Sequence, residues 1–112
     1  MKEGDVVLTP LPQTDGVIKN RPAVALCQRP PFGDWLVCGI STQLRQQVVE
    51  FDELINASDS DFATSGLKAT SLIRLGFLAV MPASKFLGVI GSISNERRGR
   101  LLGKLSEYLQ PE

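Results

Sequence analysis

Frequent glycine and proline residues divide most of this chain into short apolar runs that are rich in β-branched side chains. Such runs are typical of β-strands, because branched side chains suit extended backbone and because glycine and proline end regular elements. The pattern predicts strands at 5–10, 23–28, 35–42, 46–51, 67–75 and 86–91. The apolar run 77–81 is of the same type and can continue the strand before it.

One helix is predicted near the C-terminal end, from residue 95 to residue 109. Ser94 is its expected N-cap, and Pro111 follows its expected end. One apolar face recurs at helical spacing and comprises Leu101, Leu102, Leu105, Tyr108 and Leu109. We therefore expect a mainly β fold, in which a small, strongly bent antiparallel sheet or partial barrel is accompanied by one C-terminal helix.

Three connecting segments carry weaker signals. Residues 52–55 fit either a strand end or one helical turn. Residues 56–61 are rich in serine and aspartate and predict a polar surface loop, since these side chains bond to nearby backbone in place of regular structure. Residues 82–85 predict a short turn or helical turn.

The length of 112 residues suits a single domain, residues 1–112, with one compact core. No apolar run approaches the roughly 20 residues needed to span a bilayer. The first five residues lead into a strand without the features of a signal peptide. A cytoplasmic protein is expected.

Charge gives no general support to nucleic-acid binding, because 12 basic and 12 acidic side chains cancel. Any such binding depends on local clusters. The strongest positive cluster, in the predicted helix, is Arg97, Arg98, Arg100 and Lys104. It is either a solvated helix face or a surface that steers RNA or an acidic partner. The chain has no histidine, which excludes histidine general-base catalysis and argues against an ordinary zinc site.

The two cysteines, Cys27 and Cys38, flank a predicted turn at 30–34, so hairpin register can place them opposite each other. In a reducing cytosol we expect two buried free thiols and no disulfide. Of the aromatic residues, only Phe32 and Trp35 are expected to be exposed, where they can stack on a nucleobase or pack in an interface.

An arginine and a pair of hydroxyls are the main candidates for a site. Arg21 precedes the strand 23–28, whereas Ser41 and Thr42 end the strand 35–42. A guanidinium grips phosphate oxygens and a hydroxyl donates a hydrogen bond, so together they suit chemistry on a phosphodiester. Because strand side chains alternate, only one of the two hydroxyls should face a shared cleft if the strand is regular there. The alternative is a surface arginine in a weak salt bridge and two hydroxyls bonded to backbone.

In sequence order, the chain resembles the MazF/PemK (Kid-like) toxin family of bacterial toxin–antitoxin systems. The matching segments are Gly4-Asp5-Val6-Val7-Leu8, Arg21-Pro22-Ala23-Val24, Ser41-Thr42-Gln43, 66–74 and 89–94. The resemblance runs over nearly the whole chain and is weakest between residues 48 and 65. It implies an SH3-like small barrel of the MazF/PemK/CcdB toxin type that acts as a homodimer.

The resemblance also implies a growth-inhibiting, sequence-selective endoribonuclease that needs neither metal nor cofactor and acts on single-stranded mRNA. The 2′-hydroxyl of the RNA attacks the adjacent phosphorus and leaves 2′,3′-cyclic phosphate and 5′-hydroxyl ends. The implied catalytic residues are Arg21, Ser41 and Thr42. The loop 11–20 closes over the RNA groove in the family, and the expected RNA-binding residues are Thr14, Asp15, Lys19, Asn20 and Gln43. A cognate antitoxin with a disordered acidic segment is the implied partner.

The general base is where the chain departs from the family pattern. Kid-like members carry an arginine and an aspartate after the strand that corresponds to 67–75, whereas residues 76–82 contain no ionisable group here. Asp15 is the nearest acid before Arg21. Two alternatives therefore stay open. One is a catalytically inactive binding or regulatory protein of the same fold. The other is a CcdB-like gyrase inhibitor, against which the Arg-Pro and Ser-Thr-Gln segments argue.

Overall fold

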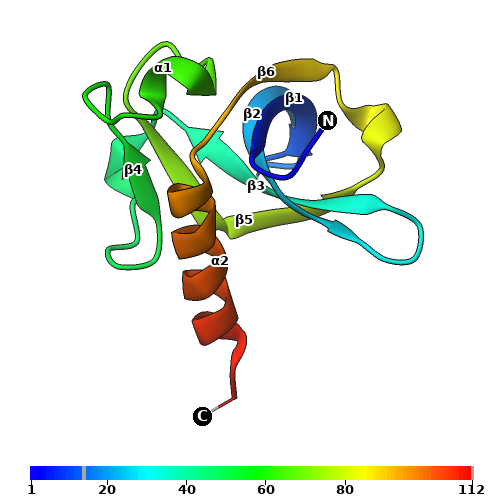
Figure 1. Cartoon of the computed structure of the whole chain (residues 1–112). Helices are drawn as coiled ribbons and strands as arrows, with labels where there is room; N and C mark the ends of the chain where they lie inside the picture. Colours follow the sequence, from blue (N-terminus) through cyan, green and yellow to red (C-terminus); the bar gives the residue numbers. More distant parts are fainter. Residues whose placement is uncertain (14, 112) are drawn as a thin grey trace.

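The protein is described by a computed structural model that covers residues 1–13 and 15–111. Its strands form one antiparallel sheet that curls into a half-barrel, in the order β4-β5-β3-β2-β1-β6 (Figure 1). The strands are β1 (Asp5–Pro12), β2 (Ile18–Arg29), β3 (Asp34–Ser41), β4 (Glu53–Ile55), β5 (Ser71–Met81) and β6 (Gly88–Ser92). The predicted mainly β fold with a bent antiparallel sheet is thereby confirmed.

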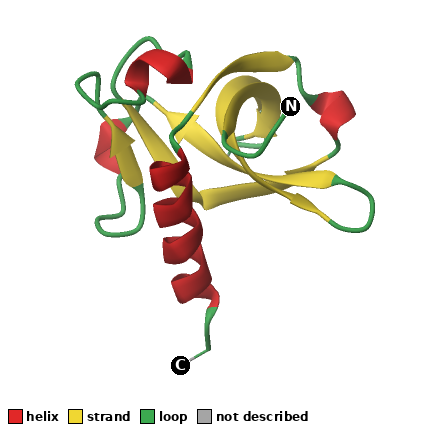
Figure 2. Cartoon of the chain, in the orientation of Figure 1, coloured by secondary structure: helices red, strands yellow, loops and turns green. Residues whose placement is uncertain are grey.

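One long helix, α2 (Asn95–Leu109), follows β6 and packs against the sheet, and its C-terminal end extends beyond the sheet (Figure 2). Its predicted bounds are confirmed, and Oγ of Ser94 caps it by accepting a hydrogen bond from the backbone N–H of Arg97 at 3.1 Å. The other helical segments are short: η1 (Leu44–Gln46), α1 (Phe62–Ser65) and η2 (Ala83–Lys85). Within the described residues, no helix is long and apolar enough to cross a bilayer.

The main error in the predicted elements lies between β3 and β4. Residues 46–51 were expected to form a strand, but they continue from η1 into turns in which the backbone N–H groups of Phe51 and Asp52 both bond to the carbonyl of Val48. The apolar side chains of Val48 and Val49 point outward, 56% and 76% exposed. The strand falls instead at Glu53–Ile55, and β5 begins at Ser71 and absorbs the run 77–81.

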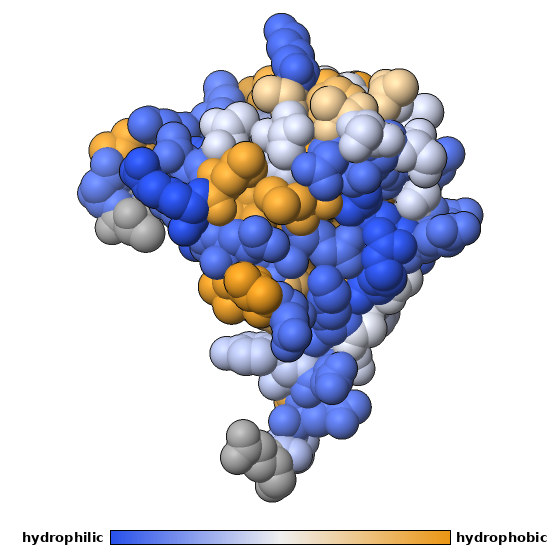
Figure 3. Space-filling model, turned by 90° about the vertical axis from the view of Figure 1, so that its left-hand side faces the viewer, coloured by the Kyte–Doolittle hydropathy of each residue, from blue (hydrophilic) through white to orange (hydrophobic). Residues whose placement is uncertain are grey.

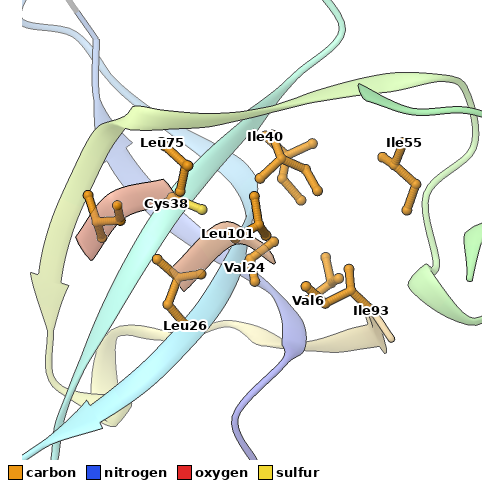
Figure 4. Close-up of a cluster of buried hydrophobic side chains, with 11 residues drawn as sticks. Val6, Val24, Leu26, Cys38, Ile40, Ile55, Leu75, Ile93 and Leu101 are labelled. Carbon is orange, nitrogen blue, oxygen red and sulfur yellow. The ribbon is translucent and has the colours of Figure 1, made fainter. Parts of the chain in front are cut away.

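Alternate residues of the strands fill two separate apolar clusters, because the curled sheet buries both of its faces. The larger cluster lies between the sheet and α2 and combines strand residues such as Val24 and Leu26 with Leu101 of the helix (Figure 4). The smaller cluster, on the opposite face, contains Val7, Leu11, Ala23, Ala25, Trp35 and Val37. Trp35 is therefore buried, contrary to expectation, whereas Phe32 is 88% exposed as expected.

The two cysteines do not face each other. Cys27 pairs with Leu36, and Cys38 pairs with Val24, so the register of the hairpin keeps them apart. Cys38 is completely buried, and the loss of hydration raises the pKa of its thiol to about 12. Both thiols are free, and Cys38 is held in its unreactive neutral form.

A buried arginine joins α2 to the segment around β4. The guanidinium of Arg97 donates to both carboxylate oxygens of Asp61 at 2.8 and 3.0 Å, to Glu53 at 3.0 Å, to Asp59 at 2.9 Å and to the carbonyl of Leu54 at 3.1 Å. All five of its N–H groups are therefore used. Hydrogen bonds from Arg97 lower the pKa of Asp61 to about 2.

The four cations that the sequence places on the helix, either as a solvated face or as a steering surface, pair with carboxylates of the same chain. Arg100 and Lys104 both pair with Glu53, at 3.3 and 3.2 Å, and Arg98 pairs with Glu3 at 3.3 Å. Burial opposes the ionised form of Glu53, but the hydrogen bonds from Arg100 and Lys104 outweigh it and lower its pKa. The helix cations thus neutralise carboxylates of the same chain, and α2 presents no free basic face.

Replacement of Arg97 should destabilise the fold strongly. Arg97→Met leaves Asp61 buried without its ion-pair partner and removes one of the three cations that pair with Glu53, so we expect the free energy of unfolding to fall by about 3–5 kcal/mol in urea titrations. Arg29→Met removes an exposed arginine at the end of β2 and should change stability by less than about 0.5 kcal/mol. Equal stability of the two variants would contradict the structural role of Arg97.

Acid should weaken the same contact. The pKa of Asp61 is about 2 in the folded chain, compared with 3.8 for an unperturbed aspartate. The stabilisation from Arg97 is therefore complete above pH 3.8 and is lost as the pH falls toward about 2. The difference corresponds to about 2 kcal/mol. Urea titrations across this range should show a flatter pH dependence for Asp61→Asn than for wild type. Asp34→Asn, which removes a carboxylate outside the Arg97 cluster, should keep the wild-type slope.

Candidate functional site

The hairpin of β2 and β3 brings the first two predicted site residues together. Ala23 pairs with Gly39, so Arg21 and Ser41 occupy facing positions two residues further along their strands. On its other side, β2 pairs with β1, and Arg21 lies opposite Thr9. Arg21 is half-buried and Ser41 is 6% exposed. Both residues line the same two cavities.

Two adjoining cavities meet at this pair and form one groove, which we call the Arg21 groove. Both cavities are lined by Arg21, Ile40 and Ser41. The first, about 350 Å³, is otherwise lined by Pro12, Gln13, Gln43, Gln46, Arg74, Gly76, Phe77 and Leu78. The second, about 400 Å³, is otherwise lined by Lys19, Asn20, Pro22, Thr42, Leu67, Lys68, Ala69 and Ser71. The groove thus runs along both sides of Arg21.

An irregularity in β5 shapes the first cavity. Cys38 pairs with Leu78 and Ile40 with Ile73, so the single residue Gly39 stands against residues 74–77 of β5. Bulges of this kind redirect side chains and are common beside functional sites. Here the bulge turns Arg74 and Phe77 into the groove lining. A Cβ on Gly39 would lie only 3.1 Å from the ring of Phe77, so glycine makes room for that ring.

A buried carboxylate holds the bulge in place. Asp52, 4% exposed, accepts hydrogen bonds from the backbone N–H of Leu75 at 3.0 Å and from that of Val48 at 2.9 Å. The first bond satisfies a backbone group in the irregular stretch, which would otherwise be buried without a partner. Asp52 therefore links the turn before β4 to the segment that carries Arg74.

The ionisable side chains that line the groove all carry positive charge. Lys19, Arg21, Lys68 and Arg74 line one or both cavities, and no carboxylate of the described residues does so. None of these four cations forms an ion pair within residues 1–13 and 15–111. The groove is therefore positive on a chain whose net charge is zero, and it suits a ligand with several negative charges.

Arg74 is the residue that sequence reasoning missed. It is not among the site residues expected from the sequence, but it lines the same cavity as Arg21. Its Nη1 donates to Oε1 of Gln46 at 3.3 Å, and its guanidinium lies 5.8 Å from the ring centroid of Phe77. No pattern in the sequence marks the bulge except Gly76 within an otherwise apolar strand.

Ser41 and Thr42 both reach the groove, because the strand ends between them. Ser41 is the last residue of β3 and lines both cavities, whereas Thr42 lies in the following bend and lines the second. The expectation that one of the two would point away assumed a regular strand. Oγ of Ser41 accepts a hydrogen bond from the backbone N–H of Gln43 at 3.0 Å, which leaves its own O–H free to donate to a ligand.

The predicted RNA-binding residues divide into three groups. Lys19 and Asn20 line the second cavity, and Gln43 lines the first. Asp15 does not line either cavity: its carboxylate accepts a hydrogen bond from the backbone N–H of Val17 at 2.9 Å within the β1–β2 turn. Thr14 lies outside the described residues. The loop predicted at 11–20 is shorter than expected, because β1 continues to Pro12 and β2 starts at Ile18.

Among the described residues, no three histidine, cysteine, aspartate or glutamate side chains come close enough together to hold a metal ion. The ionisable and hydroxyl groups that line the groove are two guanidiniums, two ammonium groups and the hydroxyls of Ser41, Thr42 and Ser71. No protein-family model and no curated protein matches this chain.

Asp52 offers a test of how the groove is built. In Asp52→Asn, one of the two carboxylate oxygens becomes an amide donor that faces a backbone N–H, so we expect a loss of about 1–3 kcal/mol in the free energy of unfolding. Asp15→Asn, which affects only an exposed turn, should cost less than about 0.5 kcal/mol. A stability of Asp52→Asn equal to wild type would contradict the bracing role.

Proposed function

We propose that this chain is a metal-independent endoribonuclease that cuts single-stranded mRNA at selected sequences and inhibits growth as the toxin of a type II toxin–antitoxin pair. The observation that carries the proposal is the placement of Arg21 and Ser41 at the centre of a groove lined by cations and by no described carboxylate. The ordered resemblance to MazF/PemK proteins supports it. On this proposal the curled half-barrel is the SH3-like barrel of that family, and the protein acts in the cytoplasm.

The chemistry follows from the charges of the site. As the 2′-oxygen bonds to phosphorus, negative charge grows on the non-bridging oxygens, and the guanidinium of Arg21 stabilises it with Ser41 donating a further hydrogen bond. The bond from phosphorus to the 5′-oxygen then breaks and the 5′-oxygen takes a proton from solvent water, which leaves a cyclic phosphate on one product and a hydroxyl on the other. Arg74 adds a second positive charge in the first cavity. Thr42, which lines the second cavity, contacts the RNA there.

The base that accepts the proton of the 2′-hydroxyl is not a carboxylate of the described groove lining. We therefore assign proton removal to solvent water, with rate acceleration supplied by charge stabilisation and by the orientation of the RNA. This makes a slow enzyme. The same observation favours the second candidate function, a binding or regulatory protein of the same fold that holds RNA without cutting it.

The proposed partners fit the surface. A disordered acidic segment of an antitoxin would complement Lys19, Lys68 and the two arginines, in the groove that RNA would otherwise occupy. A homodimer would cover apolar side chains that the single chain leaves exposed. Val89 and Ile90 on the edge strand β6, 51% and 41% exposed, are examples, and Figure 3 shows further hydrophobic patches within the hydrophilic face that bears α1 and β4.

Cleavage of a long single-stranded RNA in EDTA tests the proposal. Wild type should produce fragments with 2′,3′-cyclic phosphate ends, and Arg21→Ala should be slower by about 100- to 1,000-fold, since a transition-state donor is removed. Arg29→Ala, which removes an exposed arginine at the far end of the same strand, should cut like wild type.

Two outcomes would count against the nuclease. Equal cleavage by wild type and Arg21→Ala would place the activity outside the groove. No cleavage by folded wild type, together with binding of the RNA that Arg21→Ala weakens, would select the binding protein instead.

A further inference from the structure

Two buried polar atoms beside the groove have no hydrogen-bond partner among the described residues: Oγ1 of Thr9 and Nε of Arg21. Thr9 is completely buried, and the Nε atom of Arg21 is shielded although its residue is only half-buried. An unpaired buried polar atom is unfavourable, and native proteins satisfy nearly all such groups. Two of them next to the same site therefore call for an explanation.

The register of the sheet places these two residues side by side. Thr9 of β1 lies directly opposite Arg21 of β2 in an antiparallel pair. Side chains at opposite positions of such a pair project from the same face with their Cβ atoms about 4.5–5.5 Å apart. The neighbouring pairs on that face include Val7 with Ala23, whose side chains are buried in the smaller apolar cluster. Thr9 and Arg21 thus offer each other a polar partner at an otherwise apolar position.

The chemistry of the two atoms is complementary. The Nε–H of arginine can only donate, and the hydroxyl oxygen of threonine can accept. A rotation of either side chain that brings the two atoms within about 3 Å of each other would pair them. Valine has the same shape as threonine and would suit the apolar face better, so the hydroxyl at residue 9 has a role that packing does not supply.

We propose that Thr9 is a positioning residue for Arg21: its hydroxyl accepts the Nε–H of Arg21 when an anionic ligand fills the groove. When the hydroxyl of Thr9 accepts the Nε–H, the two terminal nitrogens of the guanidinium face the ligand. They can then donate two parallel hydrogen bonds to phosphate oxygens where the two cavities meet. This inference rests on the proposed function for its consequence in catalysis, but the Thr9–Arg21 pair itself does not.

The spectroscopic test follows the side-chain Nε–H signal of Arg21 by NMR. The probe is a single-stranded RNA oligomer whose 2′-hydroxyls are replaced by methoxy groups, so that it cannot be cut. In wild type with this oligomer, the Nε–H of Arg21 should exchange with water more slowly than that of Arg29, which is exposed. Thr9→Val should abolish this protection, and Thr9→Ser should restore it. Thr64→Val, which removes a threonine hydroxyl of α1 that donates to backbone carbonyls, should leave it unchanged.

The kinetic test uses the cleavable RNA. We expect Thr9→Val to lower kcat about tenfold with KM changed by less than about twofold, as for the loss of one hydrogen bond that matters in the transition state. Thr9→Ser should recover most of the rate. A purely structural role for Thr9 would instead lower the thermal stability and leave kcat of the folded fraction intact.

The outcomes separate the two proposals. If wild type binds the oligomer but cuts no RNA, the proposed nuclease activity is overturned. The exchange rate of the Arg21 Nε–H still tests whether Thr9 positions Arg21. If the Nε–H of Arg21 in wild type exchanges as fast as that of Arg29 with the oligomer bound, the positioning role is overturned, whatever the variants do. Protection that persists in Thr9→Val overturns it as well.

Discussion

The structure depends on one buried guanidinium. Arg97 bonds to Glu53, Asp59 and Asp61, which lie in the segment that carries the short elements β4 and α1, and so ties this segment to α2. The residue before Glu53 is Asp52, whose carboxylate holds the backbone of Leu75 in the bulge of β5. The bulge in turn aims Arg74 and Phe77 at the groove. A contact on the far side of the sheet thus helps to shape the site.

The same contacts explain how a chain with no net charge can hold a polyanion. The cations of α2 are used internally, because Arg97, Arg100 and Lys104 converge on Glu53. The cations of the groove face no described carboxylate and stay available. The net charge of the chain therefore does not indicate where a polyanion can bind. The cations that are densest in the sequence, on α2, are paired with carboxylates, whereas cations that are dispersed in the sequence line the groove.

Sequence patterns predicted the regular elements well. The C-terminal helix and its Ser94 cap could be read from apolar periodicity, and five of the strands from β-branched runs. The run 46–51 misled, because the strand signal of Val48 and Val49 is overridden by local bonds to Asp52 and to the carbonyl of Val48. The placement of Arg21 beside Ser41 follows from hairpin register and could be anticipated. The inclusion of Arg74 could not, since three extra residues in β5 change which side chains face the groove.

The central claim is that the Arg21 groove is where RNA binds, and backbone NMR shifts on titration with the methoxy-substituted RNA oligomer test it most directly. The account predicts that the shifts concentrate at Arg21, Ser41, Lys68 and Gly76 and that they weaken in Arg21→Ala, with α2 unaffected. Shifts centred on α2, or none at concentrations where the oligomer saturates other single-strand binders, would contradict the account.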